Sequence, residues 1–233
     1  FITIKGDNEK TISYNKFWND LNLISRSIKT LSKNSNLTIG ILSFNQYKSA
    51  AVDLSCLASG FRVVPIPLNS TTEHLSYIIN EANVTHLFIG GEKAIRLFNS
   101  VSKNHQLKTI DVNSTASIKG DVISWDSFLD IGEKNNSSGF DLSLTNQDMS
   151  WTSTIMYTSG STSAPKGVKF NQINIISKRF ARALALPDVN SEDIFLCYLP
   201  LFHTFGRYFE LMGSIFWGST YAFAESPSFS SLL

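Results

Sequence analysis

Short apolar runs alternate with amphipathic segments along the first half of the 233-residue chain, and this alternation limits the folds open to it. The segment 14–31 carries an apolar side chain at every third or fourth position, which predicts an amphipathic helix. Residues 37–44 (LTIGILSF) then form a nearly continuous apolar run, as buried parallel strands do. A helix is expected over 49–58, and Gly60 is well placed to end it.

The same alternation continues to residue 89. Further strands are expected over 61–66 and 84–89, and Thr71 opens a helix whose apolar positions share one face. Repeated strand–helix units predict an α/β fold, a parallel-rich β-sheet flanked by helices on both faces. We expect residues 1–111 to form a first α/β half, 112–148 a loop-rich connection with one short helix near Trp125, and 149–233 a second half.

The second half is expected to resume regular structure after the loops. The chain pattern predicts, in order, a strand over 153–157, a strand over 168–170, a helix over 174–186, a strand over 194–199, a helix over 207–216 and a strand over 219–224.

Composition excludes several classes of partner. The formal net charge of +1 gives no basic excess for nucleic acid. Cys56 and Cys197 each lie in an apolar run, which favours two reduced core thiols and a cytoplasmic protein. No apolar run reaches the roughly 20 residues of a membrane-spanning helix. A peripheral membrane contact and the oligomeric state are left open.

The chemically informative segment is 157–168 (YTSGSTSAPKGV). Its glycine allows backbone N–H groups to approach an anion, its hydroxyl side chains can donate to phosphate oxygens, and Lys166 adds a positive charge. A Walker loop is excluded because it requires Gly before the lysine and Ser or Thr after it, whereas Pro165 and Gly167 occupy these positions. The segment therefore predicts a polyphosphate site of another kind.

A second segment of interest, 199–206 (LPLFHTFG), lies further along the chain than 157–168 and contains His203. Taken alone, His203 would more often be a structural histidine than a functional one.

Together these segments identify the chain as similar to the adenylate-forming superfamily, which includes acyl-CoA synthetases, luciferases and the adenylation domains of peptide synthetases. Residues 157–168 resemble its phosphate-loop signature, with Ser163 where glycine is commoner, and 199–206 resemble its Pro-x-x-His-x-x-Gly segment. Residues 57–68 and 71–83 resemble an early structural segment to which we assign no chemistry. The segments 207–210 and 221–226 look most like long-chain fatty acyl-CoA synthetases.

The resemblance implies a two-step reaction with ATP, Mg²⁺ and coenzyme A. A carboxylate, from a long-chain fatty acid in that subfamily, attacks the α-phosphate of ATP, and a thiol then takes the acyl group from the acyl-adenylate. Because an anion attacks a polyanion, neutralisation of charge should dominate catalysis. The implied partners are small molecules: ATP, a carboxylic acid and CoA.

The resemblance also assigns roles to individual residues. It implies that Lys166 and His203 are catalytic, that Thr158 is the hydroxyl on the Mg²⁺ side, and that Phe202, His203 and Gly206 border the acyl carboxylate. The phosphates of ATP would be held by Thr158, Ser159, Gly160, Ser161, Thr162, Ser163, Lys166 and Gly167. The other histidines, His74, His86 and His105, are interpreted as structural or surface groups.

Three further parts of the family's site do not occur in these residues: the glutamate that helps to hold Mg²⁺, the aspartate that binds the ribose, and the lysine of a small C-terminal domain. We therefore expect a truncated N-terminal AMP-binding domain that by itself binds ATP weakly and turns nothing over. Two alternatives remain: an acyl- or aminoacyl-AMP ligase that loads a carrier protein, and a non-catalytic protein built on a degenerate synthetase domain.

Overall fold

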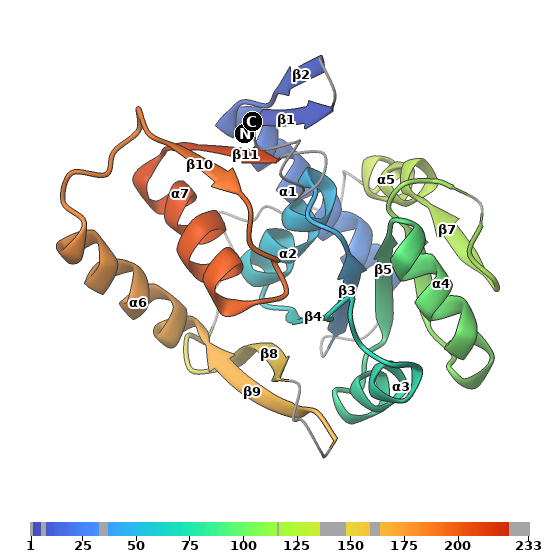
Figure 1. The fold of residues 1–233 in the computed structure, drawn as a ribbon. Helices are drawn as coiled ribbons and strands as arrows, with labels where there is room; N and C mark the ends of the chain where they lie inside the picture. Colours follow the sequence, from blue (N-terminus) through green and yellow to red (C-terminus); the bar gives the residue numbers. More distant parts are fainter. Residues whose placement is uncertain are drawn as a thin grey trace.

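A computed structural model describes residues 2–5, 8–32, 37–115, 117–135, 148–158 and 164–223. Its strands form two sheets (Figure 1). The larger sheet has seven strands in the order β7-β6-β5-β3-β4-β8-β9, and the smaller one has four in the order β10-β11-β1-β2. The larger sheet consists of β3 (Thr38–Ser43), β4 (Arg62–Pro65), β5 (His86–Gly90), β6 (Lys108–Asp111), β7 (Val122–Ser124), β8 (Thr152–Thr158) and β9 (Lys166–Asn171).

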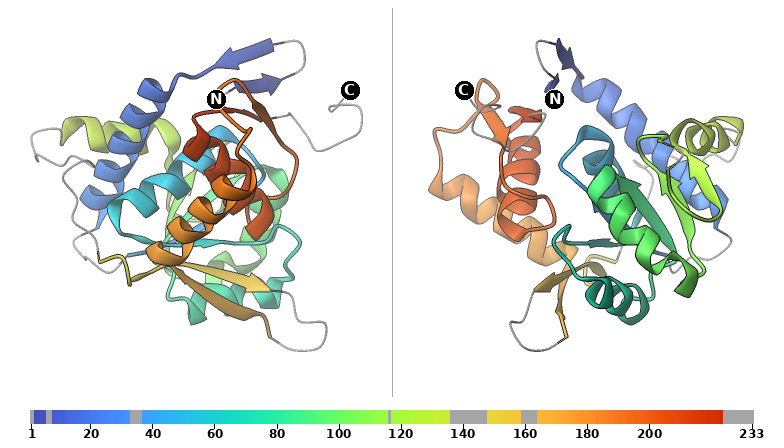
Figure 2. Two further views of the ribbon diagram at one scale, coloured as in Figure 1. Left: turned by 90° about the vertical axis from the view of Figure 1, so that its left-hand side faces the viewer. Right: turned by 45° about the vertical axis from the view of Figure 1, so that its right-hand side comes forward.

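Strand pairing in the larger sheet confirms the predicted α/β class. Every pair from β7 to β8 is parallel, and β9 alone runs antiparallel, against β8 at the edge. The β8–β9 hairpin extends from that edge of the sheet (Figure 2). Five helices belong to this part: α1 (Tyr14–Leu31), α2 (Tyr47–Ser59), α3 (Thr72–Glu81), α4 (Glu92–Val101), which runs into the 3₁₀ turn η1 (Ser102–Asn104), and α5 (Trp125–Lys134).

The ends of the predicted helices follow their local sequence signals. The hydroxyl of Ser13 accepts from the backbone N–H of Lys16 at 3.2 Å, and that of Thr71 accepts from the N–H of His74 at 3.2 Å. Both are N-cap contacts that satisfy an otherwise unpaired helix donor. Gly60 ends α2 with φ of 76°, a left-handed conformation that favours glycine.

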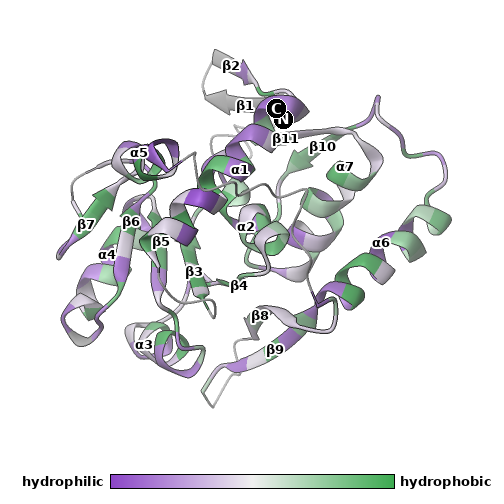
Figure 3. Ribbon diagram, turned by 180° about the vertical axis from the view of Figure 1, so that it is seen from behind, coloured by the Kyte–Doolittle hydropathy of each residue, from purple (hydrophilic) through white to green (hydrophobic). Residues whose placement is uncertain are grey.

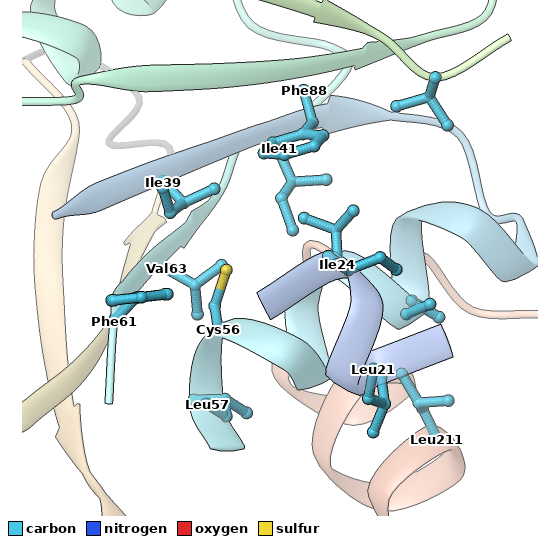
Figure 4. Close-up of a cluster of buried hydrophobic side chains, with 14 of the residues drawn as sticks. Leu21, Ile24, Ile39, Ile41, Cys56, Leu57, Phe61, Val63, Phe88 and Leu211 are labelled. Atoms are coloured by element: carbon cyan, nitrogen blue, oxygen red, sulfur yellow. The ribbon is translucent and has the colours of Figure 1, made fainter. Parts of the chain in front are cut away.

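Helices cover both faces of the larger sheet, as predicted (Figure 1). Helices α1, α2 and α5 pack on one face, and α3 and α4 on the other. On the first face, Ile24 of α1 and Cys56 of α2 meet Ile39 and Ile41 of β3 (Figure 4). Burying such side chains contributes about 1.5–3 kcal/mol each, so this two-sided core stabilises the sheet that positions the site.

The smaller sheet joins the two ends of the described chain. It consists of β1 (Ile2–Lys5), β2 (Asn8–Thr11), β10 (Ile194–Cys197) and β11 (Thr220–Phe223). Strand β1 pairs in parallel with β11 and antiparallel with β2. The predicted strand over 1–5 is confirmed for the described residues, whereas β2 was not predicted.

Between β9 and β11 lie α6 (Gln172–Ala185), the π-helical segment η4 (Phe205–Leu211) and α7 (Met212–Trp217). The helix predicted over 207–216 therefore begins two residues earlier, and its first part is π-helical rather than α-helical. Insertions of this kind are rare and often lie at functional sites. The strand predicted over 194–199 ends at Cys197, and residue 224, the last of the predicted final strand, lies outside the described residues.

The connection 112–148 contains more structure than predicted. It holds the ten-residue α5, which is the helix predicted near Trp125, and the strand β7, which was not predicted, while residues 136–147 lie outside the described part. Strand β6 was missed because its buried side chains include the polar Thr109 and Asp111 beside Ile110, which breaks the apolar run. Cys56 and Cys197 are both free and buried, in agreement with the prediction. None of the described helices has the length and apolarity required to cross a bilayer.

Candidate functional site

The β8–β9 hairpin brings the two ends of the predicted phosphate loop together. Thr158 and Lys166 are partners in the antiparallel register, and the Thr158 hydroxyl is 3.5 Å from the Lys166 carbonyl oxygen. Both residues are exposed. Gly167 pairs with Tyr157, and a Cβ there would lie 2.9 Å from Cγ2 of Ile155, so close packing of the hairpin itself favours glycine. The predicted phosphate ligands Ser159, Gly160, Ser161, Thr162 and Ser163 lie outside the described residues.

The turn that carries His203 is held from the end of β3. The side-chain amide of Asn45 donates to the Leu199 carbonyl at 2.8 Å, and its oxygen accepts from the Leu201 N–H at 2.9 Å. The His203 N–H donates to the Pro200 carbonyl at 3.0 Å, which closes the turn. These three bonds fix the backbone of the turn, while the His203 side chain stays exposed.

The histidine ring is oriented by its own chain. The backbone N–H of Phe205 donates to Nδ1 of His203 at 3.3 Å. With Nδ1 as an acceptor, the neutral ring carries its proton on Nε2 and can donate it to a ligand oxygen.

A cavity of about 290 Å³ lies between the hairpin and the histidine turn. Thr158 and Pro165 line it from the two ends of the phosphate loop, and Phe202 and His203 line it from the turn. Its remaining wall is formed by Pro67, Asn69, Ser70, His74, Ile78 and Tyr157. Two segments that are separated by about forty residues in the sequence thus share one cavity, which is close to the size range of small-molecule sites.

Sheet topology explains why these segments converge. Strand β3 lies between β4 and β5, and β4 lies beside β8. The chain after the carboxyl end of β4 supplies Asn69 and Ser70, the chain after β8 supplies the phosphate loop, and Asn45 follows β3. The crevice at the carboxyl ends of parallel strands, where the strand order reverses, is the usual ligand site of open α/β sheets.

A buried ion pair anchors the element that follows the histidine turn. Arg207 in η4 donates from Nε and Nη2 to the two carboxylate oxygens of Asp53, both at 2.6 Å. Its Nη2 also donates to the Thr154 hydroxyl at 3.1 Å, and Nη1 donates to the Tyr208 hydroxyl at 2.7 Å. Arg207 is fully buried and Asp53 is 4% exposed. Burial opposes the charge of Arg207, but the charge of Asp53 and the hydrogen bonds to Asp53 and Tyr208 raise its pKa, so the guanidinium stays charged and ties η4 to α2 and β8.

The predicted site residues therefore divide into those that line the cavity and those that do not. Thr158, Phe202 and His203 lie together at the cavity, whereas Gly206 does not line it. Gly206 is buried, and a Cβ there would be 2.6 Å from the Leu199 carbonyl oxygen. Its absent side chain lets η4 approach the turn closely. Lys166 also does not line the cavity as described, although its strand partner Thr158 does.

Several residues around the site escaped the sequence analysis. His74, Asn69 and Ser70 lie in or beside segments whose family resemblance we treated as structural. Asn45 and Asp53 belong to no motif, and Arg207 lies in the segment 207–210, whose resemblance gave it no role, so only three-dimensional contacts reveal what these residues do. The signal available in the sequence was a polar Asn at the end of an apolar strand, where parallel-sheet ligand sites are expected.

The other two histidines, His86 and His105, are packed against neighbouring protein groups. His86 is 3% exposed in β5, and burial, with a contribution from Lys108, lowers its pKa to about 4. His105 contacts the Ser76 hydroxyl at 3.2 Å, and burial lowers its pKa. Neither lines the cavity.

Metal binding requires donors beyond those at Thr158. Mg²⁺ is usually held by carboxylate oxygens together with phosphates of the substrate. In the described part of the chain, no cluster of three or more His, Cys, Asp or Glu side chains could hold a metal, and none of the described residues that line the cavity is acidic. The hydroxyl of Thr158 is thus the one predicted magnesium-side donor among these lining residues, and they do not complete a magnesium site on their own.

Comparisons with known proteins agree with this fold. The family model described as "AMP-binding enzyme" matches residues 2–232. The chain is 26% identical over 211 residues to the long-chain-fatty-acid–CoA ligase ACSBG2 of Rattus norvegicus, covering 85% of this chain and 31% of that protein. It is 29% identical over 213 residues to long chain acyl-CoA synthetase 3 of Arabidopsis thaliana, with the same two coverages. The chain thus spans about 31% of the length of these relatives.

Solved structures share the fold at low identity. The O-succinylbenzoate coenzyme A synthetase MenE of Bacillus subtilis, in complex with AMP, aligns with a TM-score of 0.73 at 21% identity, over 99% of this chain and 54% of that one. A red-emitting luciferase of Phrixothrix hirtus aligns with a TM-score of 0.76 at 19% identity, over 95% and 42% of the two chains.

The fold and the family match together define an enzyme domain of the adenylate-forming class. The chain belongs to the AMP-binding enzyme family, and its curated relatives include long-chain acyl-CoA synthetases.

Proposed function

We propose that the protein that carries this chain activates a carboxylic acid with ATP, forming an acyl-adenylate and then an acyl-CoA, and that the acid is a long-chain fatty acid. The observation that carries the proposal is the cavity that Thr158 and Pro165 share with Phe202 and His203. It brings the ends of the predicted phosphate loop beside a histidine whose Nε2–H can donate a hydrogen bond to a carboxylate oxygen. The preference for fatty acids is supported by the names of the relatives.

Each residue at the site has a role in this proposal. The loop 158–163 and Gly167 would hold the β- and γ-phosphates of ATP, with Lys166 stabilising the departing pyrophosphate by its charge. The hydroxyl of Thr158 would be a donor on the Mg²⁺ side, and the metal would supply positive charge that offsets the charge of the phosphates. His203 and Phe202 would border the acyl carboxylate as it approaches the α-phosphate. Gly206 would act indirectly, by letting η4 approach the turn.

The arrangement suits this chemistry for a physical reason. The reaction brings two negatively charged groups together, so donors that are already in place lower the barrier more than flexible ones do. The Asn45 bonds and the Asp53–Arg207 pair fix the histidine turn and the element after it, which limits the reorganisation required during the reaction.

The test is carboxylate-dependent exchange of pyrophosphate into ATP by the complete natural protein, with Mg²⁺. Fatty acids of increasing chain length are the substrates, and amino acids are the controls. We expect exchange with fatty acids only, and a maximum at long chain lengths. Exchange with amino acids, or acyl transfer to a carrier protein without CoA, would replace the proposal by a carrier-loading ligase. A folded protein without exchange for any carboxylate would indicate a non-catalytic domain.

A further inference from the structure

Tyr157, the last buried residue of β8, connects the β8–β9 hairpin to α3. Its side chain is 6% exposed, lines the cavity beside His203 and packs in the apolar cluster that includes residues of α3 and α4. Its hydroxyl donates a hydrogen bond to the carboxylate of Glu81, which lies 76 residues earlier and is the last residue of α3. The start of the predicted phosphate loop is thus attached to a helix by one side-chain contact.

On the hairpin side, the Tyr157 ring lies against the opposite strand. Tyr157 pairs with Gly167 in the antiparallel register, and a Cβ on Gly167 would lie 3.2 Å from Cζ of the tyrosine ring. The next pair along the hairpin is Thr158 with Lys166, the two described ends of the loop. Because neighbouring pairs of a β-ladder share one backbone, a displacement of the Tyr157 ring also displaces both loop ends.

On the helix side, one face of α3 is turned toward the hairpin. His74, Ile78 and Glu81 are spaced four and three residues apart, so they neighbour one another on the helix surface. His74 and Ile78 line the cavity, whereas Glu81 does not line it and is exposed. The carboxylate of Glu81 therefore acts through Tyr157 and not by contact with a ligand in this cavity.

The packing of α3 does not depend on the bond to Glu81. Leu75, Ile78 and Ile79 of α3 are almost completely buried, and the burial of their side chains holds the helix on the sheet. An exposed carboxylate contributes little to stability because water solvates it. Hydrogen bonds to a charged acceptor are nevertheless short and directional. The bond therefore determines where the Tyr157 hydroxyl lies more than it determines whether α3 folds.

We propose that Glu81 is a positioning residue, which through its hydrogen bond with Tyr157 sets where Thr158 and Lys166 lie relative to the cavity beside His203. The inference rests on the function proposed above, because it takes the loop between these residues to hold the β- and γ-phosphates of ATP. Donors stabilise a developing charge only where they are already in place, and a misplacement of about 1 Å can cost about 100-fold in rate.

Calorimetric titration of the complete natural protein with ATP and with AMP, both with Mg²⁺, tests the proposal. Tyr157→Phe keeps the ring against Gly167 and removes only the hydroxyl, and Glu81→Ala removes its acceptor. We expect each variant to bind ATP about 10-fold more weakly, because the bond to a charged acceptor is lost. AMP has no β- and γ-phosphates, so its affinity should stay the same.

Two further variants separate the bond from other effects. Glu81→Gln keeps an oxygen that can accept from the Tyr157 hydroxyl and should restore most of the ATP affinity. The matched control is Tyr77→Phe, which removes a hydroxyl from a 39% exposed tyrosine of the same helix and should change nothing. The double variant of Tyr157→Phe and Glu81→Ala should bind ATP no more weakly than either single variant, because both remove the same bond.

Several results would overturn the proposal. Unchanged ATP affinity in both single variants would show that the bond does not position the loop. Equal weakening of ATP and AMP, together with a lower thermal unfolding midpoint, would make Glu81 a structural residue. Losses that multiply in the double variant, or a Glu81→Gln variant as weak as Glu81→Ala, would show that the two residues do not act through this bond.

Pyrophosphate exchange separates a failure of this inference from a failure of the proposed function. If the variants weaken ATP binding but no carboxylate supports exchange in the parent protein, the enzymatic proposal fails and the role of Glu81 stands. If the parent exchanges with fatty acids and the variants bind ATP as it does, only the role of Glu81 fails. A parent protein that binds no ATP would overturn both.

Discussion

The helices on the two sides of the β8–β9 hairpin differ in how far their apolar side chains are buried. In residues 12–135, the apolar faces of α1 to α5 turn toward the larger sheet and are buried. In α6, the residues at spacings of three and four are exposed: Ile173 by 49%, Ile176 by 40%, Phe180 by 59% and Leu184 by 84%. Figure 3 shows β3 and β5 as hydrophobic strands, whereas hydrophobic and hydrophilic stretches alternate along α6.

The same contrast holds for buried polar groups. In the described part of the chain, buried nitrogens without a hydrogen-bond partner include Nε2 of His86 in the first region, and Nε and Nη1 of Arg179 and Nη1 of Arg182 in the second. His86 avoids the cost of a buried charge by staying neutral, whereas Arg179 remains charged at neutral pH. The first region thus buries apolar side chains on both faces of its sheet, whereas α6 leaves an apolar stripe exposed and a buried charge unpaired in the described part of the chain.

The largest expected effect lies where the two regions are joined. Asp53→Ala removes the carboxylate that partners the buried Arg207, and we expect a loss of about 3–5 kcal/mol of unfolding free energy. Denaturant unfolding measures it. The control is Glu92→Ala, which breaks an exposed pair with Arg96 and should change stability by less than about 1 kcal/mol. A small effect for Asp53→Ala would mean that the two regions are not coupled through this pair.

Truncating one isoleucine in each region tests whether the two regions differ in the burial of their apolar side chains. Ile24 in α1 is 1% exposed, so Ile24→Ala should cost about 2–5 kcal/mol through lost burial and the cavity left behind. Ile176 in α6 is 40% exposed, so Ile176→Ala should stay within about 1 kcal/mol of the parent. Both values come from the same denaturant titration. Similar losses for the two variants would show that the apolar stripe of α6 is covered in solution.

The buried histidine gives the first region a defined pH dependence. Its pKa falls from about 6.5 to about 4 on folding, so the unfolded state binds the extra proton between these values. Stability should therefore be fully present above pH 6.5 and fall as the pH drops to 4, by up to about 3 kcal/mol from this group. In His86→Phe, that part of the pH dependence should disappear from the unfolding free energy measured between pH 4 and 7. An unchanged slope would assign it to other groups.

The first region could be predicted from its sequence to a large extent. The strands β3 to β5 and the helices α1 to α3 follow from continuous apolar runs and helical periodicity, and Gly60 and Thr71 mark helix ends as expected, whereas α4 was not predicted. Strand β6 was missed because Thr109 and Asp111 are buried polar residues. The orientation of α6 could not be predicted, because periodicity finds an apolar stripe but does not say what the stripe faces.

Only those residues of the candidate site that belong to motifs could be predicted from the sequence. Thr158 and His203 were singled out from their motifs, and the structure places both at one cavity. Asn45 carries only the signal of a polar residue after an apolar strand, and His74 and Asp53 carry none, since their positions matter only once the ends of β3, β4 and β8 are side by side. Motifs thus indicate candidate residues, while the contacts that hold them in place depend on the whole sheet.

The central claim is that the hairpin and the histidine turn act as one site, and a double-mutant cycle tests it most directly. We would measure fatty-acid-dependent ATP–pyrophosphate exchange in the complete natural protein for Lys166→Ala, His203→Ala and the double variant, with the exposed Lys93→Ala on α4 as a charge-matched control. We expect each single variant to lose about 100-fold or more, the double variant to lose far less than the product of the two, and the control to be unaffected. Full exchange in either single variant, or losses that multiply, would contradict a single shared site.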